Sequence, residues 1–197
     1  MGEAEKRAVI DVMDSGELSG FFGSPSPQWL GGPKVREFED KWASTYGFKH
    51  AISVNSWTTG LMTAVGSIGI EPGDEVIVSP YTMSASATSI LFYGGIPVFA
   101  DIDPDTFNIT AATIESCITP RTRAIMVVHI FGQAADMDPI MALAKKHNLK
   151  VIEDGAQCPG IKYKGISVGA IGDIGGFSLN YHKHIHTGEG GMLVTND

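Results

Sequence analysis

Lys183 lies in a stretch of the chain whose composition suits covalent chemistry at an amine. Residues 177–191 begin as the end of an apolar run, pass Ser178 and continue through Lys183 into a glycine-rich turn. A lysine that forms a Schiff base must be partly neutral, and burial or nearby positive charge lowers the pKa of an amine toward that state. Taken alone, this stretch fits a solvated surface lysine better than a lysine that forms a Schiff base.

Three histidines alternate around this lysine, namely His182, His184 and His186. On a strand they would share one face, and imidazole is a common metal ligand. However, Lys183 stands among the three rings, and Glu189 is the sole carboxylate that follows at ligand spacing. A metal site is therefore disfavoured, and hydrogen bonding or packing is the preferred interpretation.

Two further stretches place polar side chains where a strand gives way to the next element. Residues 54–60 pass from an apolar run through Ser56, Trp57 and Thr58 into a helix, whose free N–H groups and positive dipole end suit a phosphate. Asp154 ends another apolar run, at the position where open α/β sheets bind ligands, and its carboxylate can pair with a protonated heterocyclic nitrogen. Helix capping and an ordinary turn are the simpler alternatives.

Short apolar runs alternate with helical stretches along the chain, which predicts an α/β fold whose mainly parallel sheet is covered on both faces. Helices are predicted at residues 3–13, 35–46, 58–68 and 139–147, the last with Asp138 as its N-cap. The predicted strands are residues 51–54, 75–78, 97–100, 124–128, 150–153, 176–178 and 192–195.

The overall composition excludes several classes of protein. With 197 residues, 43% of them hydrophobic, the chain can bury a sizeable core. Its net charge of −8 argues against nucleic-acid binding, which needs clustered lysine and arginine. Because it has neither an apolar run of roughly 20 residues nor a signal-peptide pattern, it is expected to be soluble, cytoplasmic and free of membrane contact. Cys117 and Cys158 fit a reducing compartment rather than a disulfide framework.

The N-terminal region is expected to differ from the rest. Residues 1–32 are predicted to form a helix and a Gly/Pro-rich arm, because residues 21–33 hold too much glycine, proline and serine for regular structure. Residues 33–197 are predicted to form one ligand-binding domain. The last strand is followed by Asn196 and Asp197, where an α/β protein would continue into a helix, so this domain is expected to be incomplete.

Taken together, the stretches resemble the DegT/DnrJ/EryC1/StrS aminotransferases, which are fold type I enzymes that depend on pyridoxal 5′-phosphate (PLP). The resemblance implies a three-layer α/β/α, PLP-binding large domain over residues 33–197, truncated before a small C-terminal domain, since family members are roughly twice this length. The strongest pieces are residues 71–78, 97–103, 118–122, 129–133, 135–137, 152–154, 156–157 and 178–191.

The resemblance also implies roles for single residues around the cofactor ring. Lys183 would bind PLP covalently and carry a proton between substrate and cofactor. Asp154 would keep the pyridine nitrogen protonated, so that the ring acts as an electron sink. Gln157 would face the phenolic oxygen of the ring.

In the same resemblance, Trp57, Thr58 and Ser178 hold the cofactor phosphate, Trp57 mainly through its backbone N–H. Two positions depart from the family pattern. Trp57 stands where glycine is common, so the close backbone approach that glycine permits is lost. Met83 stands where an aromatic residue usually stacks on the ring, with Tyr81 two positions away, and the sequence leaves open which of the two covers it.

The implied activity is transfer of an amino group from glutamate to a nucleotide-linked keto sugar, as in polysaccharide biosynthesis, by a homodimer with shared active sites. A sugar 3-dehydratase of the same family, in which histidine replaces the lysine, is one alternative that Lys183 disfavours. A non-catalytic regulatory protein that kept the fold is another. It would leave Lys183, Asp154 and Gln157 unexplained.

Overall fold

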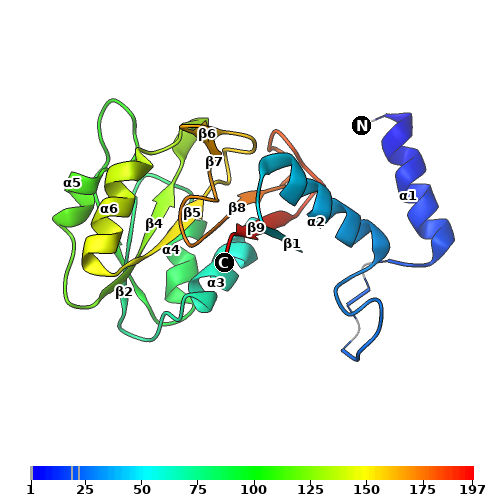
Figure 1. The fold of residues 1–197 in the computed structure, drawn as a ribbon, viewed down its shortest axis with the longest axis horizontal. Helices are drawn as coiled ribbons and strands as arrows, with labels where there is room; N and C mark the ends of the chain where they lie inside the picture. Colours follow the sequence, from blue (N-terminus) through cyan, green and yellow to red (C-terminus); the bar gives the residue numbers. More distant parts are fainter. Residues whose placement is uncertain (1, 19, 22) are drawn as a thin grey trace.

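The computed structural model describes residues 2–18, 20–21 and 23–197, so Met1, Ser19 and Phe22, the last in the predicted arm, lie outside the described residues. The helices are α1 (Glu3–Ser15), α2 (Pro33–Tyr46), α3 (Trp57–Ser67), α4 (Ser84–Leu91), α5 (Ala111–Glu115) and α6 (Met137–His147), with a 3-10 turn, η1, at Ile130–Gly132 (Figure 1). The strands are β1 (His50–Val54), β2 (Glu75–Val78), β3 (Ile96–Phe99), β4 (Thr122–Val128), β5 (Lys150–Asp154), β6 (Lys162–Tyr163), β7 (Ile166–Ser167), β8 (Ile174–Ser178) and β9 (Gly191–Thr195).

A seven-stranded sheet in the order β1-β9-β8-β5-β4-β2-β3 forms the centre of the fold. The neighbours from β8 to β3 pair in parallel, whereas β9 runs antiparallel to both β8 and β1. The predicted α/β class with a mainly parallel sheet is confirmed, and each predicted strand lies within two residues of an observed one. The short hairpin β6–β7 and the helices α4 and α5 were not predicted.

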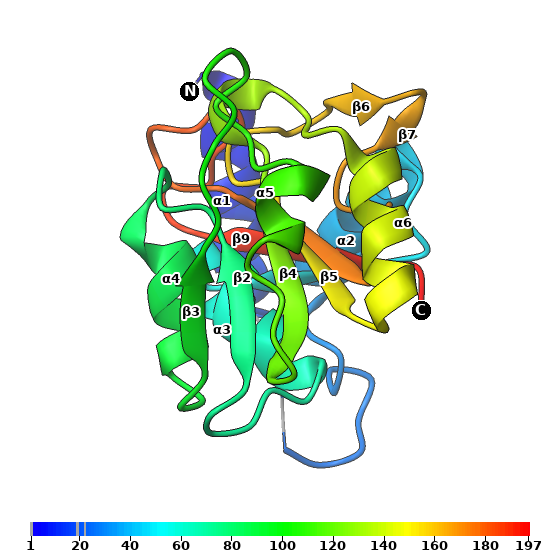
Figure 2. The ribbon, with the colours of Figure 1, turned by 90° about the vertical axis from the view of Figure 1, so that its left-hand side faces the viewer.

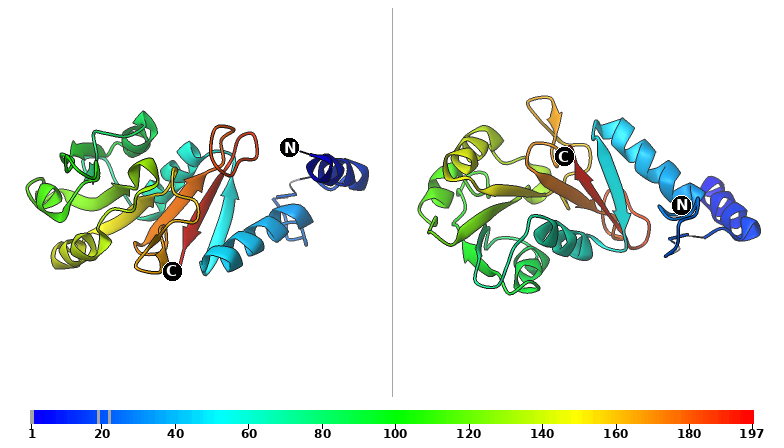
Figure 3. Two further views of the ribbon diagram at one scale, coloured as in Figure 1. Left: turned by 90° about the horizontal axis from the view of Figure 1, so that it is seen from above. Right: turned by 60° about the horizontal axis from the view of Figure 1, so that its bottom comes forward.

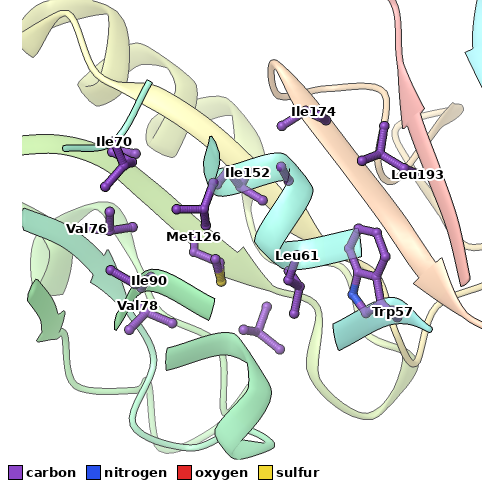
Figure 4. Packing of buried hydrophobic residues seen from close by; sticks show 14 of the residues in the cluster. Trp57, Leu61, Ile70, Val76, Val78, Ile90, Met126, Ile152, Ile174 and Leu193 are labelled. Atoms are coloured by element: carbon purple, nitrogen blue, oxygen red, sulfur yellow. The ribbon is translucent and has the colours of Figure 1, made fainter. Parts of the chain in front are cut away.

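Alternate residues of the central strands enter two different cores, which is why helices cover both faces of the sheet (Figure 3). On β2, Val76 and Val78 belong to a cluster with residues of α3 and α4, part of which is drawn in Figure 4. Ile77, between them, belongs to a second cluster with residues of α5 and α6. Figure 2 looks along the sheet from the β3 side and shows α4 and α6 on its opposite faces.

Helix α2 covers the β8–β9 end of the sheet. Trp42 of α2 packs against Phe177 of β8 with ring centroids 5.5 Å apart, and Met192 and Val194 of β9 belong to the same buried cluster. Helix α1 buries none of its residues and lies apart from the sheet, beyond α2 (Figure 1). Among the described residues, no helix combines the length and apolar character that a bilayer crossing requires.

A buried carboxylate, that of Glu153, ties β5 to the turn that precedes β8. It is fully buried, and its Oε2 lies 3.0 Å from Nε2 of His129. It also accepts backbone hydrogen bonds of 2.6–2.8 Å from Gly169, Ile171 and Gly172. A charge removed from water is tolerated only when its acceptor positions are filled in this way.

The protonation of this pair follows from its partners. The backbone N–H of Ala135 donates to Nδ1 of His129 over 3.1 Å, so Nε2 carries the ring proton and donates it to Glu153. Burial by itself raises the pKa of the Glu153 carboxyl, but hydrogen bonds from His129, Gly172 and Gly169 outweigh burial and hold that pKa below its usual range. Glu153 therefore stabilises the fold as an anion.

Replacing Glu153 by glutamine should lower the free energy of unfolding at pH 7 by about 3 kcal/mol, because the backbone donors lose a charged acceptor. A depressed folded-state pKa contributes stability above the unfolded pKa of about 4.3 and loses it as the pH falls through the folded value. The gap between wild type and Glu153→Gln should therefore narrow below about pH 4. Urea unfolding at several pH values measures it.

The matched control for this change is Glu115→Gln. Glu115 pairs with Lys146 on the surface, where solvent screens the interaction, so its replacement should leave the unfolding free energy nearly unchanged. If the difference in unfolding free energy between wild type and Glu153→Gln stays constant with pH, the negative charge of Glu153 does not stabilise the fold.

Candidate active site

Polar segments from several strands meet at one edge of the sheet. Strands β1, β2, β4, β5 and β8 run in the same direction, because β9 is antiparallel to both β1 and β8. Their carboxyl ends therefore lie together, which is where open α/β sheets bind ligands. A cavity of about 330 Å³ lies at this edge, a volume typical of small-molecule sites.

The structure brings every residue that the sequence assigned to the cofactor to this one cavity. The lining includes Trp57, Thr58, Met83, Asp154, Gln157, Ser178 and Lys183. These residues come from four segments of the chain that are far apart in sequence. The lining also contains polar residues that the sequence analysis did not assign to the cofactor: Ser56, Thr82, Ser86, Asn180, His182 and Glu189.

The carboxylate of Asp154 accepts three hydrogen bonds at the cavity wall. It is 4% exposed and accepts hydrogen bonds from the indole Nε1 of Trp57 at 2.7 Å and from the backbone N–H of Ala156 at 3.1 Å, both at Oδ1. The hydroxyl of Ser86 donates to Oδ2 over 2.8 Å. Ser86 was missed in the sequence, although it follows β2, whose carboxyl end reaches the same edge.

Helix α3 begins at the cavity wall. Its N-cap, Ser56, accepts a hydrogen bond from the backbone N–H of Thr59 over 3.2 Å. Trp57 and Thr58 stand in the first turn, where backbone N–H groups have no acceptor within the helix. Gly191 lies against this turn, and a Cβ atom there would be 2.8 Å from the nitrogen of Trp57. The helix start therefore offers donors and positive potential to an anion.

Lys183 is carried by the loop between β8 and β9. Its backbone N–H donates to the carbonyl of Asn180 over 2.9 Å, and the side chain, partly buried, lines the cavity. The amide of Asn180 donates to Glu189 over 2.5 Å, which joins the two ends of the loop. Asn180 and Glu189 thus restrict where Lys183 can lie.

The alternating histidines do not share a strand face, because residues 179–190 form turns and bends. All three histidines are exposed, and of the three only His182 lines the cavity. Within the residues that the structure describes, no group of three or more His, Cys, Asp or Glu side chains is arranged to hold a metal ion.

Gln157 is held by the loop beside it, since its Oε1 accepts the backbone N–H of Phe131 over 2.6 Å. Gln157 lines the cavity, and its amide NH₂ group offers two hydrogen-bond donors. Met83 also lines the cavity. Tyr81 instead packs against the rings of Phe107 and Phe131, with centroids 5.8 and 5.9 Å away.

The Trp57 indole occupies a slot made by glycines on neighbouring elements. A Cβ atom on Gly60, one helical turn later, would lie 2.5 Å from Cε3 of the indole. A Cβ atom on Gly176 of β8 would collide with the same ring. Trp57 is 3% exposed and lies at the end of the core cluster next to Leu61 (Figure 4). From the sequence, Trp57 was expected to contribute mainly its backbone N–H to the site.

These residues fit PLP as a ligand. A carboxylate has four acceptor positions, and three of those on Asp154 are filled, so one remains for a protonated ring nitrogen. The start of α3 supplies donors for a phosphate, and Lys183 supplies an amine in the same cavity. Cavity and sheet together define the class, which is that of PLP-dependent enzymes of fold type I.

The chain belongs to the DegT/DnrJ/EryC1/StrS aminotransferase family, whose family model matches residues 23–197. It is 47% identical over 193 residues to GDP-perosamine synthase of Caulobacter vibrioides, covering 98% of this chain and 49% of that protein. It is 45% identical over 197 residues to the spore coat polysaccharide biosynthesis protein SpsC of Bacillus subtilis, covering 100% of this chain and 48% of that protein. The chain thus spans about half the length of these curated relatives.

Solved structures agree with this assignment. An aminotransferase from Psychrobacter cryohalolentis superposes with a TM-score of 0.92 at 43% identity, covering 100% of this chain and 48% of that one. A sugar aminotransferase of Streptococcus pneumoniae described in its PLP form gives 0.90 at 29% identity, covering 100% and 51%. GDP-4-keto-6-deoxymannose-3-dehydratase, ColD, with bound GDP-perosamine, gives 0.89 at 28% identity, covering 100% and 50%.

The glycine slot makes a stability prediction. Gly176→Ala should lower the free energy of unfolding by about 2 kcal/mol, because the added methyl group overlaps the Trp57 ring and the backbone oxygen of Met192. Urea unfolding measures this change, with Gly23→Ala as the control, because no atom of the described residues other than those of Gly23 and its chain neighbours lies within 4 Å of a Cβ at Gly23. Equal stability of wild type and Gly176→Ala would show that the slot is not tight.

Proposed function

We propose that this chain is the cofactor-binding part of a PLP-dependent aminotransferase that moves an amino group from glutamate to a nucleotide-linked keto sugar. One observation carries the proposal: Lys183, Asp154 and the start of α3 line the same cavity. An amine, a carboxylate and an anion-binding helix end match the aldehyde, ring nitrogen and phosphate of PLP in turn.

The residues of the chain divide the work between them. PLP, when bound, supplies an electron sink for the bonds at the amino-bearing carbon. Asp154 keeps the ring nitrogen protonated through its free acceptor position, and the amide NH₂ group of Gln157 donates to the phenolic oxygen. Thr58, Ser178 and the backbone of Trp57 bind the phosphate. Lys183 would hold the cofactor through its Nζ and, once the amine of the donor had displaced it, would move the proton at the reacting carbon as a free amine.

The names of the relatives support a sugar substrate. The curated relatives include GDP-perosamine synthases and a UDP-linked amino-sugar 3-aminotransferase. ColD is named a 3-dehydratase, and in that branch histidine replaces the lysine, so Lys183 favours transamination for this chain. We further propose a cytoplasmic homodimer with shared active sites. The free thiols of Cys117 and Cys158 support a reducing compartment.

Covalent attachment gives the direct test of the cofactor site. Borohydride reduction of the protein incubated with PLP, followed by peptide mapping, should give one pyridoxyl adduct on Lys183, because this lysine lines the cavity with Asp154 and Ser178. Lys183→Ala should abolish the adduct. An adduct on Lys162 or Lys164, which do not line the cavity, would refute the assignment.

The reaction class is tested by half-reactions followed in the visible spectrum. Glutamate alone should convert bound PLP to its amino form and release 2-oxoglutarate, and a nucleotide-linked keto sugar should reverse the change. Lys183→His should lose covalent attachment and repeated turnover, because imidazole moves protons but does not bond to the aldehyde. If no amino donor changes the spectrum while PLP stays bound, the protein is not an aminotransferase. A dehydratase or a non-catalytic protein then becomes the preferred interpretation.

A further inference from the structure

Two side chains on different helices converge on the carboxylate of Asp154. Trp57 starts α3 and donates its indole N–H to Oδ1, and Ser86 of α4 donates its hydroxyl to Oδ2. Both donors are buried, Trp57 at 3% and Ser86 at 0% exposure. Their polar atoms are therefore shielded from water, and each finds its partner in the same acid.

We propose that Trp57 and Ser86 are positioning residues that fix the Asp154 carboxylate so that one acceptor position of Oδ2 faces the ring nitrogen of the cofactor. This inference rests on the proposed function, since it concerns how the PLP site is held. Oδ1 is filled by Trp57 and Ala156, and Oδ2 has one of its two positions filled by Ser86. A carboxylate held from both oxygens cannot rotate without breaking a buried hydrogen bond.

The donor direction at Ser86 is fixed by the carboxylate of Asp154. Its Oγ lies 3.0 Å from the Oγ1 of Thr82 and 2.8 Å from Oδ2 of Asp154. A carboxylate can only accept, so the single proton of Ser86 points to Asp154 and the hydroxyl of Thr82 donates to Ser86. The chain Thr82, Ser86, Asp154 is thus oriented throughout, and each donor strengthens the next.

The indole is equally constrained, because its slot allows little other placement. Gly60 and Gly176 leave space for the ring plane, and the resulting orientation aims Nε1 at Asp154. Trp57 therefore supplies Asp154 with a side-chain donor that the backbone at position 57 does not provide.

The experiment compares two cofactors that differ at one atom. PLP and 1-deazapyridoxal 5′-phosphate, which carries carbon in place of the ring nitrogen, are each titrated into apoprotein to obtain dissociation constants. Trp57→Phe keeps an aromatic ring in the slot but removes the donor, and Ser86→Ala removes the hydroxyl. Each should weaken PLP binding by roughly fivefold or more, because the acid is no longer preorganised. Binding of the deaza analogue should change by less than about twofold, since it makes no bond to Asp154.

Matched controls separate positioning from packing. Trp42→Phe removes another buried indole N–H, one that has no partner within the described part of the chain. Ser89→Ala removes a hydroxyl that is also fully buried on α4 but donates to the carbonyl of Ser86 instead. Both controls should leave the ratio of the two dissociation constants at the wild-type value.

The outcomes are distinct. Equal weakening of PLP and analogue in Trp57→Phe and Ser86→Ala would mean that the residues only shape the cavity, which overturns the inference. Unchanged binding of both ligands would overturn it as well. If Trp57→Phe does not fold, Ser86→Ala decides alone. Wild-type protein that binds neither ligand would refute the proposed function itself, which distinguishes that failure from the failure of this inference.

Discussion

The structure depends on keeping a buried negative charge at the end of β5. Asp154 is 4% exposed, and a carboxylate in such a place is stable only when donors replace water. Its donors come from the start of α3, from α4 and from its own turn, so the helices on this face must lie where they do for the charge to persist. The preceding residue, Glu153, points to the opposite face and is satisfied there by the turn before β8. The end of β5 thus carries one acid that faces the cavity and one acid that is bound within the fold.

Much of this architecture was readable from the sequence because the central strands, such as β2, β5 and β8, are short, apolar and buried on both faces. Ser86 was missed because its role depends on how α4 packs, and a serine in a serine-rich run carries no signal of its own. The hairpin β6–β7 has two residues on each strand, too few for any periodicity. The alternating histidines would share a face only on a strand, and residues 179–190 form a loop instead.

Trp57 illustrates the limit most clearly. The resemblance assigned its backbone N–H to the phosphate, which follows from the position at a helix start. The direction of its indole could not be inferred, because it is determined by Gly60, one turn later, and by Gly176, more than a hundred residues further along the chain. The cavity therefore depends on residues that local pattern treats as unrelated. The loop that carries Lys183 also depends on residues that are apart in the sequence, because the hydrogen bond between Asn180 and Glu189 joins its two ends.

The glycine slot also has a consequence for the history of the sequence. A tryptophan at position 57 is accommodated most easily when glycine already occupies positions 60 and 176, since a Cβ at either place meets its ring. Once the ring is there, its loss would leave a void and cost about 3–5 kcal/mol, as large-to-small changes of buried tryptophan do. A change at any one of the three positions alone therefore lowers stability. The three positions form an entrenched set, and lineages carrying Trp57 are expected to retain all three together.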